Sequence, residues 1–260
     1  NLGNNATFGF VVTSAGVLLI DPGGSYRGAQ EIHKVSKRVT ELPVVAVINT
    51  GGQDHRWLGN DYFKQQGARI IASARAVADQ QDRTQDQLIG LTNLVGEAGM
   101  QGTDPVYADE TFEQRLDLTL GETRIEIRHS GQAHTPGDSY VWLPQHRVMF
   151  SGDIVYVERM LGVGSQSNSK SWIEAFEAMA AFEPRHLVPG HGKATTLAHA
   201  RKDTLGYLQF LRSAVADFMD SGGDISDIGS IDQSSYLYLQ NHDTLAGRNA
   251  QQVFTEMEWE

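Results

Sequence analysis

Four short motifs hold acid and imidazole side chains that are suited to catalysis or metal binding. They are "GGQDH", "GQAHTPGDS", "MFSGDIVY" and "LVPGHGKA", which contain Asp54 and His55, His134, Asp153, and His191. Each motif follows an apolar run typical of a buried strand, and each contains glycine, which lets the backbone bend sharply. Because loops at one edge of a layered sheet converge, we expect these side chains to share one cleft.

Imidazoles and carboxylates in a chain without cysteine form a ligand set for a divalent cation. The candidate ions are zinc, iron and manganese. Such an ion polarises a substrate oxygen and lowers the pKa of a bound water toward neutrality. Taken singly, each residue has a simpler interpretation as a hydrogen-bonding loop residue, and Asp153 in "SGD" as a helix N-cap. The occurrence of all four motifs favours the metal site.

The composition excludes several other classes of protein. The 260 residues carry a net charge of −11 without a cluster of Lys and Arg, so neither nucleic acid nor an anionic membrane surface is an expected partner. The absence of cysteine excludes disulfides and thiolate catalysis, and no apolar run is long enough for a membrane span. The chain begins at Asn1 and not Met, which is compatible with export to a periplasm. The expected partner is a small-molecule substrate or ligand.

Hydrophobic periodicity predicts the elements that position these motifs. The alternation of apolar and polar residues indicates a hairpin over residues 7–24. Apolar residues at helical spacing indicate a helix over 25–39. A strand over 44–48 precedes the Asp54 loop, and a helix over 58–66 and the strand "ARIIAS" follow it. Residues 75–100 are polar and helix-prone, so we expect a solvated helix or a cap there.

The second half again gives strands and then helices. Residues 111–130 predict a meander, and a further hairpin turns at Pro144–Gln145. An amphipathic helix over 169–182 precedes the strand that enters "PGHG", and helices over 195–219 and 243–259 follow. We therefore expect one domain over residues 1–260 with a C-terminal helical extension from about 195.

The order of Asp-His, "HTPGDS", "FSGD" and "PGHG" resembles the metallo-β-lactamase fold superfamily of metallohydrolases. The resemblance extends from "GFVVTSAGVLLIDPG" to "LVPGHG". It implies an α/β fold, an αβ/βα four-layer sandwich in which two mixed β-sheets lie face to face with helices outside. It also implies a metal cleft at one edge of the sheets. The C-terminal "GRNAQQVFTEMEWE" is similar to the tail of a branch associated with sulfur oxidation or quinoprotein maturation.

One loop departs from the pattern of this superfamily. The family loop is His-x-His-x-Asp-His, and an alignment on its Asp-His end puts Thr50 and Gly52 in place of the two leading histidines. In the family those two histidines and the one that matches His134 hold the first metal. The resemblance therefore implies that the first metal site is degenerate.

The second metal site is intact in residue type. In the family the residues that match Asp54, His55 and His191 hold this metal, and the one that matches Asp153 bridges the two ions. One ion still activates a water when a coordination position is open. We expect a metal-dependent hydrolase of an ester, thioester, lactone or similar small molecule, with a mononuclear site and with Asp54, Asp153 and His134 as catalytic residues. The alternative is a non-catalytic protein that binds a small ligand or a protein partner in the old cleft.

The residues around the Asp-His pair have simpler interpretations as well. Gly51 and Gly52 are expected in a turn that needs positive φ, and alternatively they leave space for a ligand group. Arg56 is expected in a surface ion pair, and alternatively beside a substrate anion. Trp57 is expected to pack at the start of the next helix.

Overall fold

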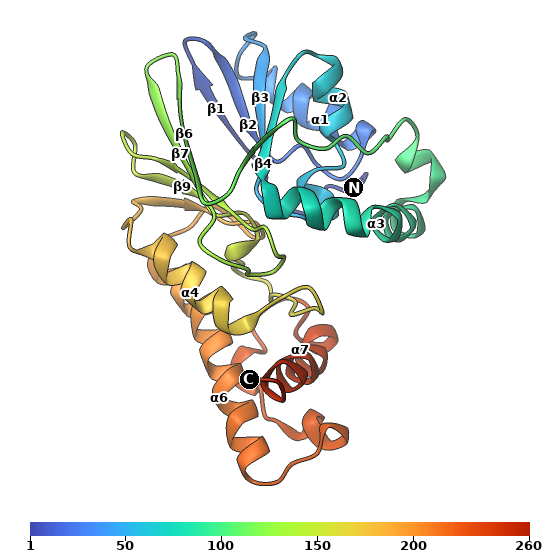
Figure 1. Ribbon diagram of the computed structural model, residues 1–260, viewed down its shortest axis with the longest axis vertical. Helices are drawn as coiled ribbons and strands as arrows, with labels where there is room; N and C mark the ends of the chain where they lie inside the picture. Colours follow the sequence, from blue (N-terminus) through green and yellow to red (C-terminus); the bar gives the residue numbers. More distant parts are fainter.

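The computed structural model describes residues 1–260 and contains two five-stranded sheets (Figure 1). The first sheet has the order β1-β2-β3-β4-β5, and its strands are β1 (Gly9–Thr13), β2 (Gly16–Ile20), β3 (Val44–Asn49), β4 (Arg69–Ser73) and β5 (Glu110–Phe112). Strands β1 and β2 form the predicted antiparallel hairpin, and the other pairs are parallel. Strands β2 and β3 are almost wholly buried, which explains their continuous apolar sequences.

The second sheet comes from the middle of the chain and has the order β10-β9-β8-β7-β6. Its strands are β6 (Arg115–Leu120), β7 (Thr123–Arg128), β8 (Tyr140–Leu143), β9 (Val148–Phe150) and β10 (His186–Val188). The first four strands form the predicted antiparallel meander and hairpin, and β10 adds to β9 in parallel. Residues of β6 alternate between exposed and half-buried, because one face of this edge strand packs on the core.

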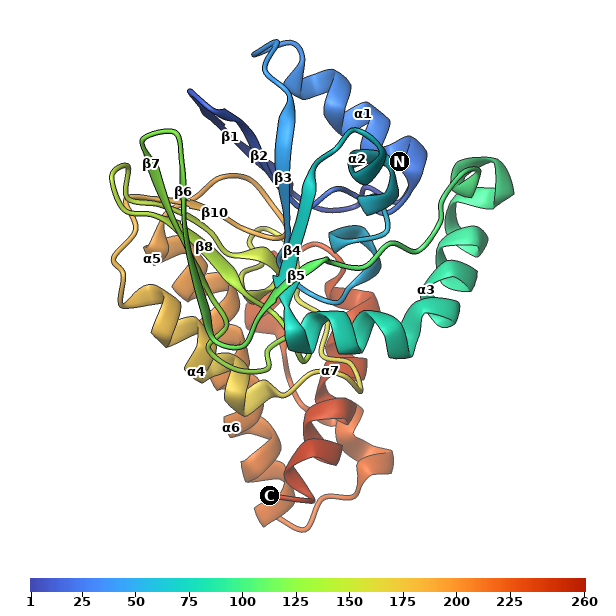
Figure 2. The same cartoon turned by 45° about the horizontal axis from the view of Figure 1, so that its top comes forward.

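The two sheets pack face to face through an apolar core to which both contribute (Figure 2). Its members include Leu18, Ile20, Ile48, Ile71, Ile125, Ile127, Val141 and Phe150. Helices α1 (Tyr26–Ser36) and α2 (Asn60–Gln65) cover the outer face of the first sheet, and α4 (Ser169–Ala180) covers that of the second. The expected four-layer αβ/βα sandwich is therefore confirmed.

The C-terminal helices pack against α4 and the second sheet. The helix expected over 195–219 is divided into α5 (Leu197–Ala200), a π-helical turn over Arg201–Leu205, and α6 (Gly206–Asp220). Short helical turns over Ile225–Ser230 and Ser234–Tyr236 lead to α7 (His242–Met257), which contacts α6. None of these or the other helices has the length and apolar character needed to cross a membrane.

Helix α3 (Ala74–Met100) differs from the expected solvated helix. Its polar residues Gln80, Thr84 and Gln87 are buried and follow one another at helical spacing. The side-chain amide of Gln80 donates to the carbonyl of Gly51 at 3.1 Å, and that of Gln87 donates to the carbonyl of Gly52 at 2.8 Å. The buried face of α3 is polar because it packs on the backbone of a loop, which needs hydrogen-bond partners.

Candidate metal centre

Three of the predicted site residues meet where strands of both sheets end. His55 lies in a short helical turn, Asp54–Arg56, after β3, and Asp153 lies in a similar turn, Gly152–Ile154, after β9. His191 follows β10. One ligand atom from each of the three residues lies within 4.8 Å of the other two, and all three are buried.

The geometry of this cluster suits a cation. His55 Nε2 lies 3.4 Å from Asp153 Oδ2, and His191 Nε2 lies 3.2 Å from Asp153 Oδ1. His55 Nε2 is buried and has no hydrogen-bond partner. A buried nitrogen without a hydrogen-bond partner destabilises the fold. The position of this nitrogen opposite a carboxylate is therefore typical of a metal ligand. Two imidazoles and one carboxylate are a ligand set found at catalytic zinc sites.

Asp54 lies outside this cluster and contacts His55 instead. Its Oδ1 atom accepts hydrogen bonds from the His55 backbone N–H at 2.6 Å and from His55 Nδ1 at 2.8 Å. Burial opposes ionisation of Asp54, but the hydrogen bonds and charge of His55 outweigh it and lower the pKa of this carboxyl. An ionised Asp54 keeps the proton of His55 on Nδ1 and leaves Nε2 free for an ion.

The protonation states of the cluster follow from burial and charge. Burial opposes ionisation of Asp153, but Arg56 and the two histidines hold its pKa well below the usual range. Burial lowers the pKa of the His191 imidazole to about 3, so this ring is neutral. Burial and Arg56 act to lower the pKa of His55, whereas Asp153 and Asp54 outweigh them and raise it. The cluster thus offers a buried carboxylate and a neutral imidazole, the forms that bind metals.

Arg56 is fully buried and uses all its N–H groups, so the expectation of a surface ion pair is wrong. Nε and Nη2 donate to Asp153 Oδ2 and Oδ1 at 3.1 and 2.7 Å, and Nη1 donates to Asp21 Oδ2 at 2.8 Å. The carbonyls of Gly190 and Thr7 accept the remaining bonds. Two buried carboxylates require a positive charge between them. The guanidinium of Arg56 supplies this charge and donates hydrogen bonds to both.

The two glycines before Asp54, Gly51 and Gly52, have a steric cause that neither interpretation of the sequence anticipated. Neither Gly51 nor Gly52 has positive φ. A Cβ atom at Gly51 would overlap the carboxylate of Asp138, and one at Gly52 would overlap that of Asp79. The space that a histidine at position 52 would need is therefore filled by the carboxylate of Asp79. Trp57, the remaining residue of this segment, is buried and stacks on Tyr107, as expected for packing.

His134 also lies outside the cluster but lines the same pocket as His55 and His191. Its Nδ1 donates to the carbonyl of Gly162 at 3.0 Å, which leaves Nε2 as the free nitrogen. Burial lowers the pKa of His134, so its ring is neutral. The roles of Asp54 and His134 as metal ligands stay predictions, because the structure does not bring them into the group of three.

The pocket beside the cluster has a volume of about 260 Å³. Its polar lining includes Asp54, His55, His134 and His191, and Leu91, Leu94 and Leu245 supply an apolar wall. Two of these leucines, Leu91 and Leu94, come from α3. This volume is sufficient for a small molecule.

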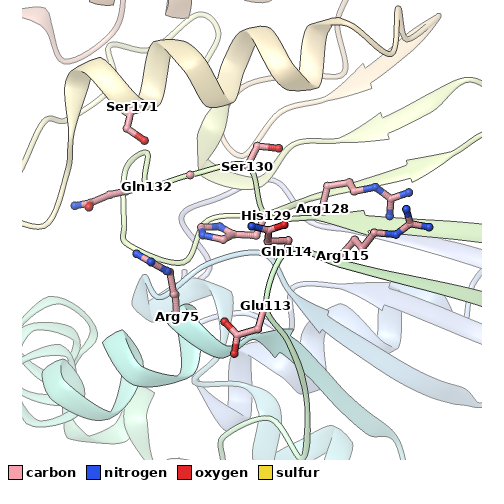
Figure 3. Close-up of a pocket in the computed structure, with 10 residues that line it drawn as sticks. Arg75, Glu113, Gln114, Arg115, Arg128, His129, Ser130, Gln132 and Ser171 are labelled. Atoms are coloured by element: carbon pink, nitrogen blue, oxygen red, sulfur yellow. The ribbon is translucent and has the colours of Figure 1, made fainter.

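A larger pocket of about 810 Å³ lies elsewhere, between the start of α3, the segment after β7 and α4 (Figure 3). None of its lining residues is hydrophobic, and His129 lies there and not in the metal cluster. The arginines Arg115 and Arg128 on its wall are paired with Asp117. This pocket carries no group of metal ligands.

Sequence reasoning missed Arg159 and Tyr156, which both contact His191. Arg159 Nη1 lies 3.0 Å from His191 Nδ1, and the ring of Tyr156 stacks on that of His191 with centroids 4.5 Å apart. Both residues follow Asp153 in a segment without regular structure. Their proximity to Asp153 in the sequence was the one available signal, because no periodic pattern marks them.

Known proteins match this chain over most of its length. A family model described as the metallo-beta-lactamase superfamily matches residues 3–191. The metallo-beta-lactamase type 2 of Elizabethkingia meningoseptica is 24% identical over 187 residues, which cover 70% of this chain and 67% of that protein. Metallo-beta-lactamase IND-1 of Chryseobacterium indologenes is 23% identical over 186 residues, with 70% of each chain covered.

Solved structures show the same fold at low identity. A metallo-beta-lactamase from Pontibacter korlensis has a TM-score of 0.65 and 20% identity, and the match covers 78% of this chain and 93% of that one. A variant of the sec-alkyl sulfatase PisA1 has a TM-score of 0.78 and 14% identity, and covers 98% of this chain but 48% of that one. The family model spans most of the sequence and includes all five candidate site residues, so the chain belongs to the metallo-beta-lactamase superfamily.

Proposed function

We propose that this protein is a metal-dependent hydrolase whose single cation is held by His55, Asp153 and His191. The observation that carries the proposal is the buried Nε2 atom of His55, which lacks a hydrogen-bond partner and lies 3.4 Å from Asp153 Oδ2. Two nitrogen donors and one oxygen donor favour zinc, with iron or manganese as alternatives, and leave a position open for water.

The residues around the ligands have supporting roles in this proposal. Asp54 fixes the ring of His55 through Nδ1. Arg56 holds Asp153 ionised and in place through two hydrogen bonds. A bound cation supplies Lewis acidity and lowers the pKa of a water. Asp54 and Asp153 therefore contribute to catalysis through the geometry and charge of the site.

His134 is the residue that we assign to proton transfer. Because its Nδ1–H is held by the carbonyl of Gly162, Nε2 is the atom that accepts a proton in the pocket. A neutral imidazole suits this task near neutral pH. His134 Nε2 takes a proton from the attacking water and returns it to the leaving group. The substrate is an ester, thioester, lactone or similar small molecule that fits a pocket of about 260 Å³.

Metal content tests the site. We expect the protein, loaded with zinc and then dialysed, to retain about one equivalent by mass spectrometry. His55→Ala and His191→Ala should each lose most of the metal, because two protein ligands bind a divalent ion weakly. His146→Ala is the matched control, since His146 is exposed in the hairpin turn and should leave the metal content unchanged. Full zinc retention in His55→Ala would contradict the proposed ligand set.

The alternative is a non-catalytic protein that binds a small ligand in the same pocket. It is favoured by Arg56, which already provides a positive charge to both oxygens of Asp153. If zinc, iron and manganese all fail to bind the unmodified chain, the metal-dependent activity is excluded. Ligand-binding screens directed at the pocket of His134 would then replace ester assays.

A further inference from the structure

The pocket of about 810 Å³ that Figure 3 shows has a lining that no step of the proposed hydrolysis uses. It shares no residue with the pocket beside the metal cluster. None of its lining residues is hydrophobic, whereas most small-molecule pockets are lined predominantly by apolar and aromatic side chains. A ligand gains little here from the burial of apolar surface. The lining therefore favours a molecule that is hydrophilic over its whole surface.

Arg75 gives this pocket a positive charge that no carboxylate of the protein neutralises. The residue is exposed in the first turn of α3, and its guanidinium extends toward the loop that carries His129 and Gln132 (Figure 3). This guanidinium makes no hydrogen bond and has no carboxylate oxygen within 4.0 Å, not even that of Glu113, the one acidic residue of the lining. A free guanidinium binds a phosphate or carboxylate group through two parallel hydrogen bonds.

The other two arginines of the lining are held in place by carboxylates. Arg115 Nη2 lies 2.5 Å from Asp117 Oδ2, and Arg128 Nη1 lies 2.6 Å from Asp117 Oδ1. Arg128 Nη2 also lies 2.7 Å from Glu126 Oε2. In Figure 3 both of these arginines point away from Arg75. Arg75 is therefore the group of this pocket that is free to bind an anion.

The pocket also contains hydrogen-bond acceptors, which select a second kind of group on the ligand. Nδ1 of His129 donates to the carbonyl of Asp138 at 2.8 Å, which leaves Nε2 of the neutral ring as an acceptor without a partner. The amide of Gln132 donates to the carbonyl of Gln166 at 2.9 Å, which leaves Oε1 free. The carboxylate of Glu113 accepts no hydrogen bond. Three free acceptors favour a ligand that donates several hydrogen bonds, as a sugar does through its hydroxyl groups.

We propose that this pocket binds a sugar that carries a phosphate or carboxylate group. Arg75 binds the anionic group, and Glu113, His129 and Gln132 accept hydrogen bonds from the hydroxyls. A nucleobase or an acyl chain would find no apolar wall to cover it. The proposal does not rest on the proposed hydrolase function, because no residue of this site lines the pocket of the candidate metal centre.

Isothermal titration with small probes tests the choice of ligand. The probes are glucose 6-phosphate, glucuronate, glucose and inorganic phosphate, and the full chain is first treated with a chelator and dialysed so that no metal contributes. We expect at least one of the two sugar anions to bind roughly 10-fold more tightly than either glucose or inorganic phosphate, because only the sugar anion engages both kinds of group. Tight binding of one sugar anion alone identifies phosphate or carboxylate as the group that Arg75 recognises.

Arg75→Ala tests the anionic side of the site. It should weaken the binding of the sugar anion roughly 10- to 100-fold and leave the binding of glucose nearly unchanged. Because the guanidinium of Arg75 has no partner in the protein, the substitution should not disturb the fold. Arg38→Ala also removes an exposed arginine without an ion pair, so it is the control for net charge and should bind like the unmodified chain.

Glu113→Ala tests the hydroxyl side of the site. The change in charge affects the binding of both anions, so the quantity to measure is the preference for the sugar anion over inorganic phosphate. We expect this preference to fall roughly 3- to 10-fold through the loss of one acceptor. The proposal is overturned if neither sugar anion binds, if Arg75→Ala binds it as tightly as the unmodified chain does, if glucose or inorganic phosphate binds equally well, or if Glu113→Ala keeps the full preference.

Discussion

Three consecutive residues of one helical turn have three different tasks at the candidate centre. Asp54 holds the ring of His55, His55 faces Asp153 with a free nitrogen, and Arg56 supports Asp153 with two hydrogen bonds. A short helical turn directs successive side chains to different sides, so neighbours in the sequence do not share a ligand position. This is why the sequence motif Asp-His alone cannot assign both members to the metal.

Arg56 is the residue on which the buried charges depend. Arg56→Met keeps the length of the side chain but leaves Asp21 and Asp153 buried without their cation. We expect a loss of about 3–5 kcal/mol in the free energy of unfolding, because unpaired buried charges are strongly destabilising. Urea unfolding in the presence of a chelator measures the loss without a contribution from metal.

Arg69→Met is the control for this substitution. Arg69 is exposed and pairs with one carboxylate, that of Glu110, at the surface. We expect it to cost about 1 kcal/mol or less. If Arg56→Met costs no more than Arg69→Met, the network around Asp153 does not stabilise the fold.

At the scale of elements, helix α3 supports the loop that precedes the cluster. Gln80 and Gln87 donate to two successive loop carbonyls, and the indole N–H of Trp57 donates to Gln87 Oε1 at 2.8 Å. The glycines that accept these bonds allow close approach of the carboxylates on α3 and on the segment after β7. The helix therefore stabilises the loop through polar contacts and not through an apolar stripe.

Gln87→Leu tests this role of α3. Leucine has a similar size but leaves the Trp57 N–H and the Gly52 carbonyl buried without partners. We expect a loss of about 2–4 kcal/mol in the free energy of unfolding, since each orphaned group costs roughly 1–3 kcal/mol. Gln85→Leu on the exposed face of the same helix is the control and should change stability by less than about 0.5 kcal/mol. Equal effects of the two variants would show that the polar face is not required.

The elements themselves were largely predictable from the sequence, because periodicity reports burial. The hairpins, the buried strand Val44–Asn49 and the amphipathic helices have patterns that match their environments. The contacts of Arg56 and of α3 were not predictable. Charged and amide side chains are usually solvated, and only their position in the fold supplies buried partners. Of the predicted ligands, the structure groups His55, Asp153 and His191, and the roles of Asp54 and His134 depend on local geometry that spacing does not encode.

In the whole molecule, hydrogen bonds join the two sheets at the same edge that carries the candidate metal centre. The Ser139 N–H donates to the Thr50 carbonyl at 2.7 Å, and the Gly52 N–H donates to Thr135 Oγ1 at 3.2 Å. The C-terminal helices hold the next segment, because Thr204 bonds the backbone N–H and carbonyl of Tyr156 at 3.0 and 2.6 Å. Both halves of the chain therefore fix the site, and a change in the join between sheets affects the stability of the whole fold.

Asp138 makes this join sensitive to pH. It accepts hydrogen bonds from the backbone N–H and hydroxyl of Thr135, yet burial raises its pKa from 3.8 to about 8. Between these values the folded chain binds more protons than the unfolded chain at this group, so its contribution to stability falls as pH rises. The slope is at most about 1.4 kcal/mol per pH unit.

Asp138→Asn removes this titration and keeps a polar side chain of the same shape. We therefore expect the stability of the unmodified chain to fall more steeply than that of Asp138→Asn between pH 5 and pH 8, as measured by urea unfolding with a chelator present. Asp220→Asn, at the exposed end of α6, should leave the slope unchanged. Parallel curves for the unmodified chain and Asp138→Asn would mean that Asp138 is ionised throughout this range, and that its hydrogen bonds to Thr135 outweigh its burial.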